Sequence, residues 1–207
     1  MGVAASVFVV DDDPSVRKSL TRLIESAGYT VEAFASARDF LKAATAGGPC
    51  CLVLDVRMPG MTGLDLQRTL AQAVHRIPIV FVTGQGDIPM TVTAMKAGAV
   101  DFLTKPFAAR DLLDAVQRAV EKDTRNLGTE ARSRSLHARV KTLTPRERQV
   151  FALVVTGMLN KQIAAQLNVV EKTVKVHRAR VMDKMRAGSF AELVRLADAA
   201  GVIVAQT

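Results

Sequence analysis

Residues 52–66 have the sequence LVLDVRMPGMTGLDL, and this stretch decides the fold of the first half of the chain. The apolar run Leu52–Leu54 is typical of a buried strand, and it stops at an acidic residue, Asp55. The amphipathic stretch Gly63–Ala73 that follows has the period of a helix. The segment therefore predicts a strand, a short loop and a helix, with a carboxylate at the point where the strand ends.

The same alternation extends outward in both directions. Four other short apolar runs are expected to form strands, at Val7–Val10, Tyr29–Phe34, Ile79–Val82 and Val100–Leu103. Further stretches of helical period lie at Val16–Ala27, Ala37–Ala44, Pro89–Ala97 and Ala109–Glu121. Five strand–helix units predict an α/β domain with a five-stranded, parallel, doubly wound sheet of the flavodoxin-like type. Such sheets bind ligands at the carboxyl ends of their strands.

Polar side chains follow four of these strands. Asp11 and Asp12 follow the first strand, Asp55 the third, Thr83 the fourth and Lys105 the fifth. Carboxylates that share one rim of a sheet repel each other, which raises their pKa values unless a cation is present. Carboxylate oxygens are typical ligands of Mg²⁺. A hydroxyl and an ammonium group beside them suit a phosphoryl group, with Asp55 as the nucleophile.

Each of these residues also has a purely structural interpretation. An aspartate after a strand is often a helix cap, and Asp13, just before Pro14, is the best candidate for that role. A phosphatase of the haloacid dehalogenase type is a chemical alternative, because such enzymes have D-x-D-x-T after the first strand. Asp11 and Asp13 have that spacing, but Ser15 stands at the last position. The sequence has no G-x-x-x-x-G-K-[ST] phosphate loop.

The excess positive charge lies in the second part of the chain. The 207 residues include 28 Lys and Arg against 20 Asp and Glu, a net charge of +8. Residues 1–122 hold 13 of each sign, so residues 123–207 carry the whole excess. This asymmetry indicates two domains, the second of which either binds nucleic acid or is merely a soluble basic domain. No apolar run approaches eighteen residues and no secretory signal is evident, so we expect a cytoplasmic protein without a membrane partner.

The second part has helical periodicity only. Residues 123–142 are polar and arginine-rich and are expected to form a linker, with helical spacing near Leu136 and Val140. Whether this linker is a rigid helix or a flexible tether stays open. Four short helices are expected near 145–156, 161–167, 171–185 and 189–200. The predicted organisation is a domain at 1–122, a linker at 123–142 and an all-α domain at 143–207.

Residues 161–185 predict a helix, a short turn and a second helix. The second helix has an apolar stripe of Val174, Val181 and Met185. Residues 171–186 hold six basic and two acidic side chains, most of them away from that stripe. This pattern fits a recognition helix that enters the major groove of DNA, and a solvated basic face is the alternative.

The first half resembles a known family. The segments VFVVDDDPSVRKSL (7–20), LVLDVRMPGMTGLDL (52–66), VFVTGQGD (80–87) and FLTKPF (102–107) resemble, in order and spacing, the receiver domain of two-component response regulators. The resemblance covers residues 6–122, and GDIPMTVTAMKAGAVDF (86–102) is similar to the FixJ/NarL-like branch. It implies that Asp55 accepts a phosphoryl group from a sensor histidine kinase, with Thr83 and Lys105 on the phosphoryl oxygens. It also implies a switch formed by Thr83 and Phe102.

The resemblance implies further detail at the same rim. Asp12, Asp55 and the backbone carbonyl of Arg57 would bind Mg²⁺, with Asp11 helping through water. The peptide bond between Lys105 and Pro106 would be cis. Gly60 and Gly63 would permit the tight loop that follows the phosphoacceptor.

The second half resembles the LuxR-type helix-turn-helix domain. The match runs from Leu143 to about residue 200, on LTPRERQVFALVVTGMLNKQIAAQL (143–167) and TVKVHRARVMDKM (173–185). Leu159 and Val170 depart from it, because Ser or Thr usually caps the two helices there. Loss of a cap costs on the order of 1 kcal/mol, and Asn168 is a candidate substitute. Two sets of DNA-contacting residues are expected: Lys175, Val176 and Ala179 at base edges, and Lys172, Thr173, His177, Arg178 and Arg180 at phosphates.

The sequence thus predicts a DNA-binding response regulator that is not an enzyme beyond slow hydrolysis of its own phosphoryl group. Phosphorylation is expected to promote homodimerisation through the face of the fourth helix, fifth strand and fifth helix. Double-stranded DNA, a sensor histidine kinase and RNA polymerase are the expected partners. Three alternatives stay open: a phosphorylation-independent transcription factor, a metal-dependent phosphatase and a pure interaction protein.

Overall fold

The structure is a computed structural model, and it describes residues 5–45, 47–72, 76–84 and 88–202. The chain divides into two compact units, Met1–Leu127 and Gly128–Thr207, and each is considered by itself. The division falls inside a single long helix, α5 (Ala109–Lys141), which therefore belongs to both units.

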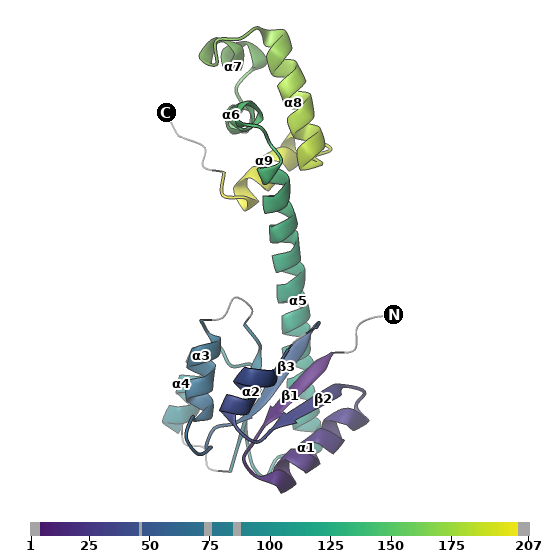
Figure 1. The fold of residues 1–207 in the computed structure, drawn as a ribbon, viewed down its shortest axis with the longest axis vertical. Helices are drawn as coiled ribbons and strands as arrows, with labels where there is room; N and C mark the ends of the chain where they lie inside the picture. The colour runs from purple at the N-terminus through teal and green to yellow at the C-terminus, as the bar shows by residue number, and fades with distance from the viewer. Residues whose placement is uncertain (1–4, 46, 73–75, 85–87, 203–207) are drawn as a thin grey trace. The chain divides into compact units, whose positions relative to one another are not determined.

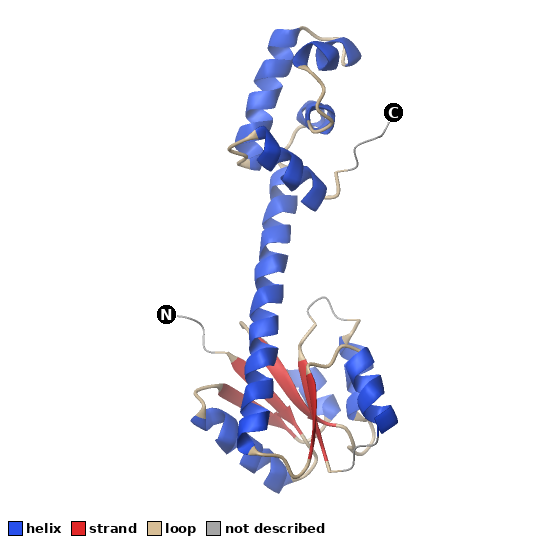
Figure 2. Ribbon diagram, turned by 180° about the vertical axis from the view of Figure 1, so that it is seen from behind, coloured by secondary structure: helices blue, strands red, loops and turns tan. Residues whose placement is uncertain are grey.

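The first unit is built on a five-stranded sheet in which every pair of neighbours is parallel (Figures 1 and 2). Its strands are β1 (Ser6–Val10), β2 (Thr30–Phe34), β3 (Cys50–Asp55), β4 (Ile79–Thr83) and β5 (Asp101–Thr104). Its helices are α1 (Pro14–Ser26), α2 (Ala37–Ala43), α3 (Gly63–Leu70), α4 (Ile88–Lys96) and the first part of α5. The strand order β2-β1-β3-β4-β5 confirms the doubly wound, flavodoxin-like fold that the alternating pattern predicted.

Helices cover both faces of this sheet. On one face α2, α3 and α4 contribute side chains such as Phe40, Leu66 and Ala94 to an apolar layer. On the other face α1 and α5 contribute Ile24 and Leu112, and Figure 2 shows α5 lying across the sheet. β3 is buried along its whole length because it lies between β1 and β4. The end of β3 at Asp55 is therefore enclosed by neighbouring parts of the fold.

Local sequence explains where the helices that border the rim begin. The Asp13 side chain accepts hydrogen bonds from the backbone N–H groups of Ser15 and Val16, which confirms it as the cap of α1. Thr62 and Asp65 form a capping box at the start of α3. Gly63 lies so close to the backbone of Asp55 that a Cβ atom there would be 2.3 Å from the Asp55 carbonyl oxygen. Only glycine fits this turn without a shift of the backbone.

The second unit is all-α, as predicted. Its helices after α5 are α6 (Pro145–Val154), α7 (Asn160–Gln166), α8 (Glu171–Met185) and α9 (Phe190–Ala199). Their apolar sides form one core that includes Phe151, Ile163, Val174 and Met185. Leu136 is buried in this same core and Val140 packs against it, so the end of α5 is part of the second unit.

Two details of the second unit differ from simple capping rules. α7 and α8 begin at the caps Leu159 and Val170, neither of which makes a side-chain capping bond. Asn168 does not substitute, contrary to our expectation. It has the left-handed conformation, with φ of 50°, and follows the end of α7. Its backbone is therefore used to end one helix, and its side chain does not cap the next.

Candidate functional site

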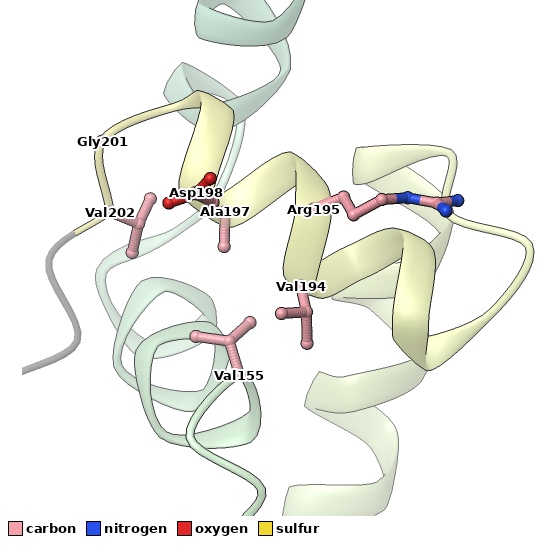
Figure 3. Close-up of a pocket in the computed structure, with 7 residues that line it drawn as sticks. All are labelled: Val155, Val194, Arg195, Ala197, Asp198, Gly201 and Val202. Carbon is pink, nitrogen blue, oxygen red and sulfur yellow. The ribbon is translucent and has the colours of Figure 1, made fainter.

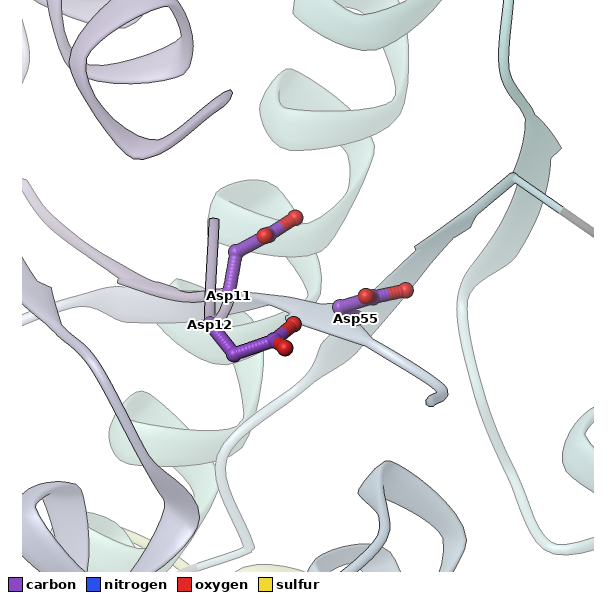
Figure 4. A group of neighbouring side chains, drawn as sticks. All are labelled: Asp11, Asp12 and Asp55. Atoms are coloured by element: carbon purple, nitrogen blue, oxygen red, sulfur yellow. The ribbon is translucent and has the colours of Figure 1, made fainter. Parts of the chain in front are cut away.

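An acidic cluster lies at the carboxyl rim of the sheet. Asp11 and Asp12 follow β1, and Asp55 is the last residue of β3, as Figure 4 shows. The register of β1 against β3 pairs Val10 with Leu54, so the residues that come next are neighbours. One carboxylate oxygen of each residue lies within 4.8 Å of the others. The Asp13 side chain is outside the cluster because it caps α1, which removes the D-x-D-x-T geometry of the phosphatase alternative.

Asp55 combines burial with an unused oxygen atom. Its exposed fraction is 8%, and its Oδ1 atom is buried without a hydrogen-bond partner among the described residues. Burial raises the pKa of Asp55, and the neighbouring Asp11 carboxylate adds to that effect. The charge of Lys105 and the backbone N–H groups of Val56 and Arg57 act in the opposite direction. The site thus holds a carboxylate with one buried, unpartnered oxygen among the described residues, next to a cation.

Lys105 is held on Asp11. Its Nζ atom is 2.7 Å from Asp11 Oδ2, and the Asp11 side chain is almost fully buried. Asp11 Oδ1 accepts the backbone N–H of Asp13, and Arg17 donates to the Asp11 carbonyl oxygen at 2.7 Å. The peptide bond between Lys105 and Pro106 is cis, as the resemblance implied. Asp11 is therefore the residue that positions the lysine at the rim.

The remaining residues predicted for this rim lie around it. Thr83 is the last residue of β4 and is 1% exposed. Phe102, on the neighbouring strand β5, is half-buried, with its ring centroid 6.1 Å from that of Phe81. Arg57 is exposed in the loop directly after β3. Gln85, Gly86 and Asp87, which end the receiver-like segment 80–87, lie outside the residues that the structure describes.

A second candidate site is the exposed side of α8. Five of the side chains predicted to meet DNA are exposed there, and three are half-buried. The exposed ones are Lys172, Lys175, Val176, Ala179 and Arg180, and the half-buried ones are Thr173, His177 and Arg178. The opposite side of α8 supplies Val174, Val181 and Met185 to the core. The helix therefore presents a basic side with a small apolar spot at Val176 and Ala179.

Two of these side chains have protein partners, and a third has a buried atom without one. Arg178 donates to Asn160 Oδ1 at 3.2 Å, and its guanidinium lies 5.6 Å from the centroid of the Phe190 ring. Lys175 forms an ion pair with Glu171 at 3.2 Å. The Nδ1 atom of His177 is buried without a partner among the described residues. Arg178 thus ties α7 to the start of α9, which the sequence pattern did not reveal.

The structure also contains a hollow of about 550 Å³ between α6 and α9. Val155 and Val194 face each other across it, while Arg195 extends away from it (Figure 3). None of the residues predicted to bind DNA lines this hollow.

Family models match stretches in both units. The sequence model of the response regulator receiver domain matches residues 7–117, and that of the bacterial regulatory proteins of the LuxR family matches residues 141–197. The first match alone covers more than half of the chain and includes the acidic cluster. The chain is a response regulator with a LuxR-family DNA-binding domain.

Related proteins and structures match nearly the whole chain. Nodulation protein W of Bradyrhizobium diazoefficiens is 52% identical over 96% of this chain and 87% of its own length. The transcriptional regulatory protein FixJ of the same organism is 42% identical over 98% of this chain and 99% of its own. The structure of the response regulator StyR superimposes with a TM-score of 0.87 at 47% identity, covering 95% of this chain and 99% of that one.

As a response regulator, the protein uses its two units for phosphoryl signalling and for DNA binding. The acidic cluster has the ligand chemistry of a divalent metal site, because Asp11, Asp12 and Asp55 supply close oxygen atoms and Asp55 Oδ1 is buried without a partner in the described part of the chain. In the described part of the chain, every helix is too short or too polar to span a bilayer.

The sequence did not reveal several contacts of this response regulator. Glu147 and Lys184 match the LuxR pattern, but their ion pair joins residues 37 positions apart. The bond from Arg139 to the Met185 carbonyl spans 46 positions. No periodic signal links such distant residues, so these contacts become visible only in the folded unit.

Proposed function

We propose that Asp55 is the phosphoacceptor and that its phosphorylation controls DNA binding by the LuxR-type domain. The observation that carries this proposal is the buried, unpartnered oxygen of Asp55 beside two further carboxylates and Lys105. An oxygen of the Asp55 carboxylate attacks the phosphorus atom of a phosphohistidine on a sensor kinase. The phosphorus–nitrogen bond breaks, the imidazole leaves, and an acyl phosphate is formed.

The rim residues have distinct roles in this transfer. Asp11, Asp12, Asp55 and the Arg57 backbone carbonyl would hold Mg²⁺, which supplies charge neutralisation to the phosphoryl oxygens when it is bound. Thr83 donates a hydrogen bond to one phosphoryl oxygen, and Lys105 pairs with another. Lys105 already lies at the rim through its ion pair with Asp11. The new phosphoryl group therefore competes with Asp11 for the lysine.

The switch couples this rim to a dimer face. Thr83 and Phe102 reposition when the phosphoryl group recruits the threonine hydroxyl, which changes the face of α4, β5 and α5. Ile88 is 80% exposed on α4, and Val92 and Met95 are each 42% exposed. These apolar side chains support homodimerisation on this face, because contact with a second copy removes them from water.

DNA recognition then uses two copies of α8. Lys175, Val176 and Ala179 contact base edges in the major groove, and Lys172, Thr173, His177, Arg178 and Arg180 contact phosphates. The functional organisation is a receiver at 1–122, a linker at 123–142 and a DNA-binding domain at 143–207. The protein acts in the cytoplasm with RNA polymerase, and its only hydrolytic reaction is slow loss of its own phosphoryl group.

Intact mass spectrometry tests the proposal directly. The wild type, Asp55→Asn and Asp13→Asn are each incubated with Mg²⁺ and acetyl phosphate. Asp13→Asn is the matched control, because asparagine caps a helix as well as aspartate does. We expect one added phosphoryl group on the wild type and on Asp13→Asn, and none on Asp55→Asn.

The same three proteins then bind duplexes selected from a random pool by the phosphorylated wild type. We expect tighter binding by the two phosphorylated proteins than by Asp55→Asn. Equal affinities would instead identify a phosphorylation-independent transcription factor. Phosphorylation of Asp55→Asn would refute the assignment of the acceptor.

A further inference from the structure

The ends of α5 and α8 are joined in the second unit by a pair of reciprocal bonds. Arg139, near the end of α5, donates through Nη1 to the backbone carbonyl of Met185, the last residue of α8, at 3.2 Å. Lys184, near the end of α8, donates through Nζ to the carbonyl of Thr142, the residue after α5, at 3.0 Å. Each helix thus places a cation at the carboxyl end of the other, where unpaired carbonyls and the helix dipole favour positive charge.

A buried carboxylate fixes one side of this joint. Lys184 also contacts Glu147 Oε2 at 2.6 Å, and the exposed fraction of Glu147 is 2%. The same oxygen accepts the backbone N–H of Thr144, just before α6. The hydrogen bond from Lys184, and after it the one from the Thr144 backbone, hold the pKa of Glu147 below its usual range. The Lys184 ammonium is therefore held in one position among the ends of three helices.

Apolar packing holds the other side of the joint. Leu136 is buried in the core of the second unit together with Val181 and Met185 of α8. Val140, one turn further along α5, packs against the same core. Arg139 lies between these two contacts in sequence, so its bond to Met185 sets how α8 is turned against α5.

The joint lies at the end of α8, so a small tilt there produces a larger displacement at the start of the same helix, where DNA contacts are proposed. The distance from Met185 to Lys172 along α8 is about 20 Å at 1.5 Å per residue. A tilt of about 5° at the joint would move the start of α8 by about 2 Å over such a length. A shift of that size separates hydrogen-bond partners at base edges and phosphates.

We propose that Arg139 and Lys184 are positioning residues that fix the recognition helix α8 to the end of α5, and that phosphorylation reaches DNA binding through this joint. The proposal rests on the proposed function, since it requires that phosphorylation changes DNA affinity. α5 is the next element along the chain after β5, the strand that carries Phe102, and residues 105–108 connect the two. A change of α5 is therefore passed to α8 through bonds that belong to this chain.

Arg139→Met is the variant that tests the proposal. Methionine keeps an apolar side chain against the core and removes the donor, and Lys184 and Glu147 stay paired. Arg139→Lys restores a cationic donor. Arg134→Met is the matched control, because Arg134 lies on the same helix, is exposed, and has no partner in the part of the chain that the structure describes.

For each full-length protein, DNA affinity is measured with and without acetyl phosphate and Mg²⁺, together with the extent of phosphorylation and the melting temperature. We expect Arg139→Met to be phosphorylated normally but to lose about two- to fivefold of the affinity gain, the range that one cation at a helix end provides. Arg139→Lys should regain most of the gain, and Arg134→Met should match the wild type.

A residue with a merely structural role would lower both affinities by the same factor and leave their ratio unchanged. That result would overturn the proposal, as would a normal gain in Arg139→Met. A wild type that is phosphorylated but shows no gain in affinity would overturn the proposed function as well, so the two failures can be told apart.

Discussion

Replacement of Gly63 by alanine should damage the proposed phosphoacceptor site by displacing the backbone of Asp55. In the structure the backbone N–H of Gly63 donates to the Val56 carbonyl at 2.9 Å, which draws the start of α3 against the end of β3. A Cβ atom at position 63 would lie 2.3 Å from the Asp55 carbonyl oxygen and 3.0 Å from Val56 Cα. Both neighbours are backbone atoms, so neither can rotate away as a side chain could.

The size of the effect follows from this geometry. Ordinary contact begins at 3.4 Å, so the two segments must separate by about 1 Å. Overpacking of this kind typically costs about 1–3 kcal/mol of folding free energy. Because the displaced backbone is that of Asp55 itself, the carboxylate moves with it. A misplacement of about 1 Å can slow a reaction by about a hundredfold.

Two measurements check this prediction. Thermal unfolding gives the loss of stability, and a time course of intact mass with acetyl phosphate and Mg²⁺ gives the rate of phosphorylation. Gly128→Ala is the contrast, because Gly128 lies within α5 and a Cβ atom there would have, among the described residues, no atom within 4 Å apart from its chain neighbours and the backbone of its own helix. This variant should be more stable than the wild type by about 1 kcal/mol. A Gly63→Ala protein with wild-type melting temperature and phosphorylation rate would refute the argument from close approach.

Three further predictions concern single side chains. Asp55→Asn should raise the melting temperature at pH 7 by a few degrees, about the effect of 1 kcal/mol. Burial raises the pKa of Asp55 in the fold, so the stability that the Asp55 carboxyl contributes is present below its unfolded pKa and is lost as the pH rises through the folded pKa. Thermal melts at pH 7 and pH 4 should therefore show that the melting-temperature gain of Asp55→Asn shrinks in acid. Val170→Ser should stabilise the second unit by about 1 kcal/mol in urea unfolding, because α8 has no side-chain cap, and no change would mean that the N–H groups are already satisfied. Burial raises the pKa of the Cys50 thiol to about 12, and the Cys51 side chain is equally buried. Both thiols of the native protein should therefore react with a disulfide reagent at pH 8 about a thousandfold more slowly than those of the protein unfolded in urea. Rapid reaction of the native protein would show that β3 opens locally.

The sequence was sufficient for the fold of the first unit because one simple rule connects pattern to position. Apolar runs of strand length alternate with helical periods, and parallel strands must end at a common rim. That rule alone brought Asp11, Asp12 and Asp55 together, and the structure places their oxygens within 4.8 Å of each other. The cap at Asp13 was equally accessible, because it depends only on its neighbours in the chain.

Contacts between distant residues could not be predicted in the same way. The ion pair of Lys105 with Asp11 spans 94 positions, and the sequence indicated only that both residues lie at the rim. Arg178 was expected at a phosphate, but the fold brings Asn160 and Phe190 to it. Such choices depend on how neighbouring helices are turned, which periodicity does not specify.

The linker illustrates a limit of composition. Residues 123–142 are polar, and that composition is compatible with either a tether or a solvated helix. The structure has α5 continuing to Lys141, with Leu136 and Val140 one turn apart and packed against the second core. The spacing of these two apolar residues is thus a better indicator of a helix in this segment than its arginine-rich composition is of a tether.

The cations that hold the helices of the second unit together also set how the protein should respond to ionic strength. Arg139 and Lys184 donate to the ends of α8 and α5, and Arg146 donates to the Leu167 carbonyl at 2.6 Å. Binding to DNA releases about 0.9 counterion for each phosphate that a cation neutralises. Cations that already donate to the protein's own carbonyls release none, so these three lower the expected release by about 2.7 ions per subunit relative to a simple count of basic residues. The second unit should therefore keep more of its DNA affinity at high salt concentration than a count of its basic residues would predict.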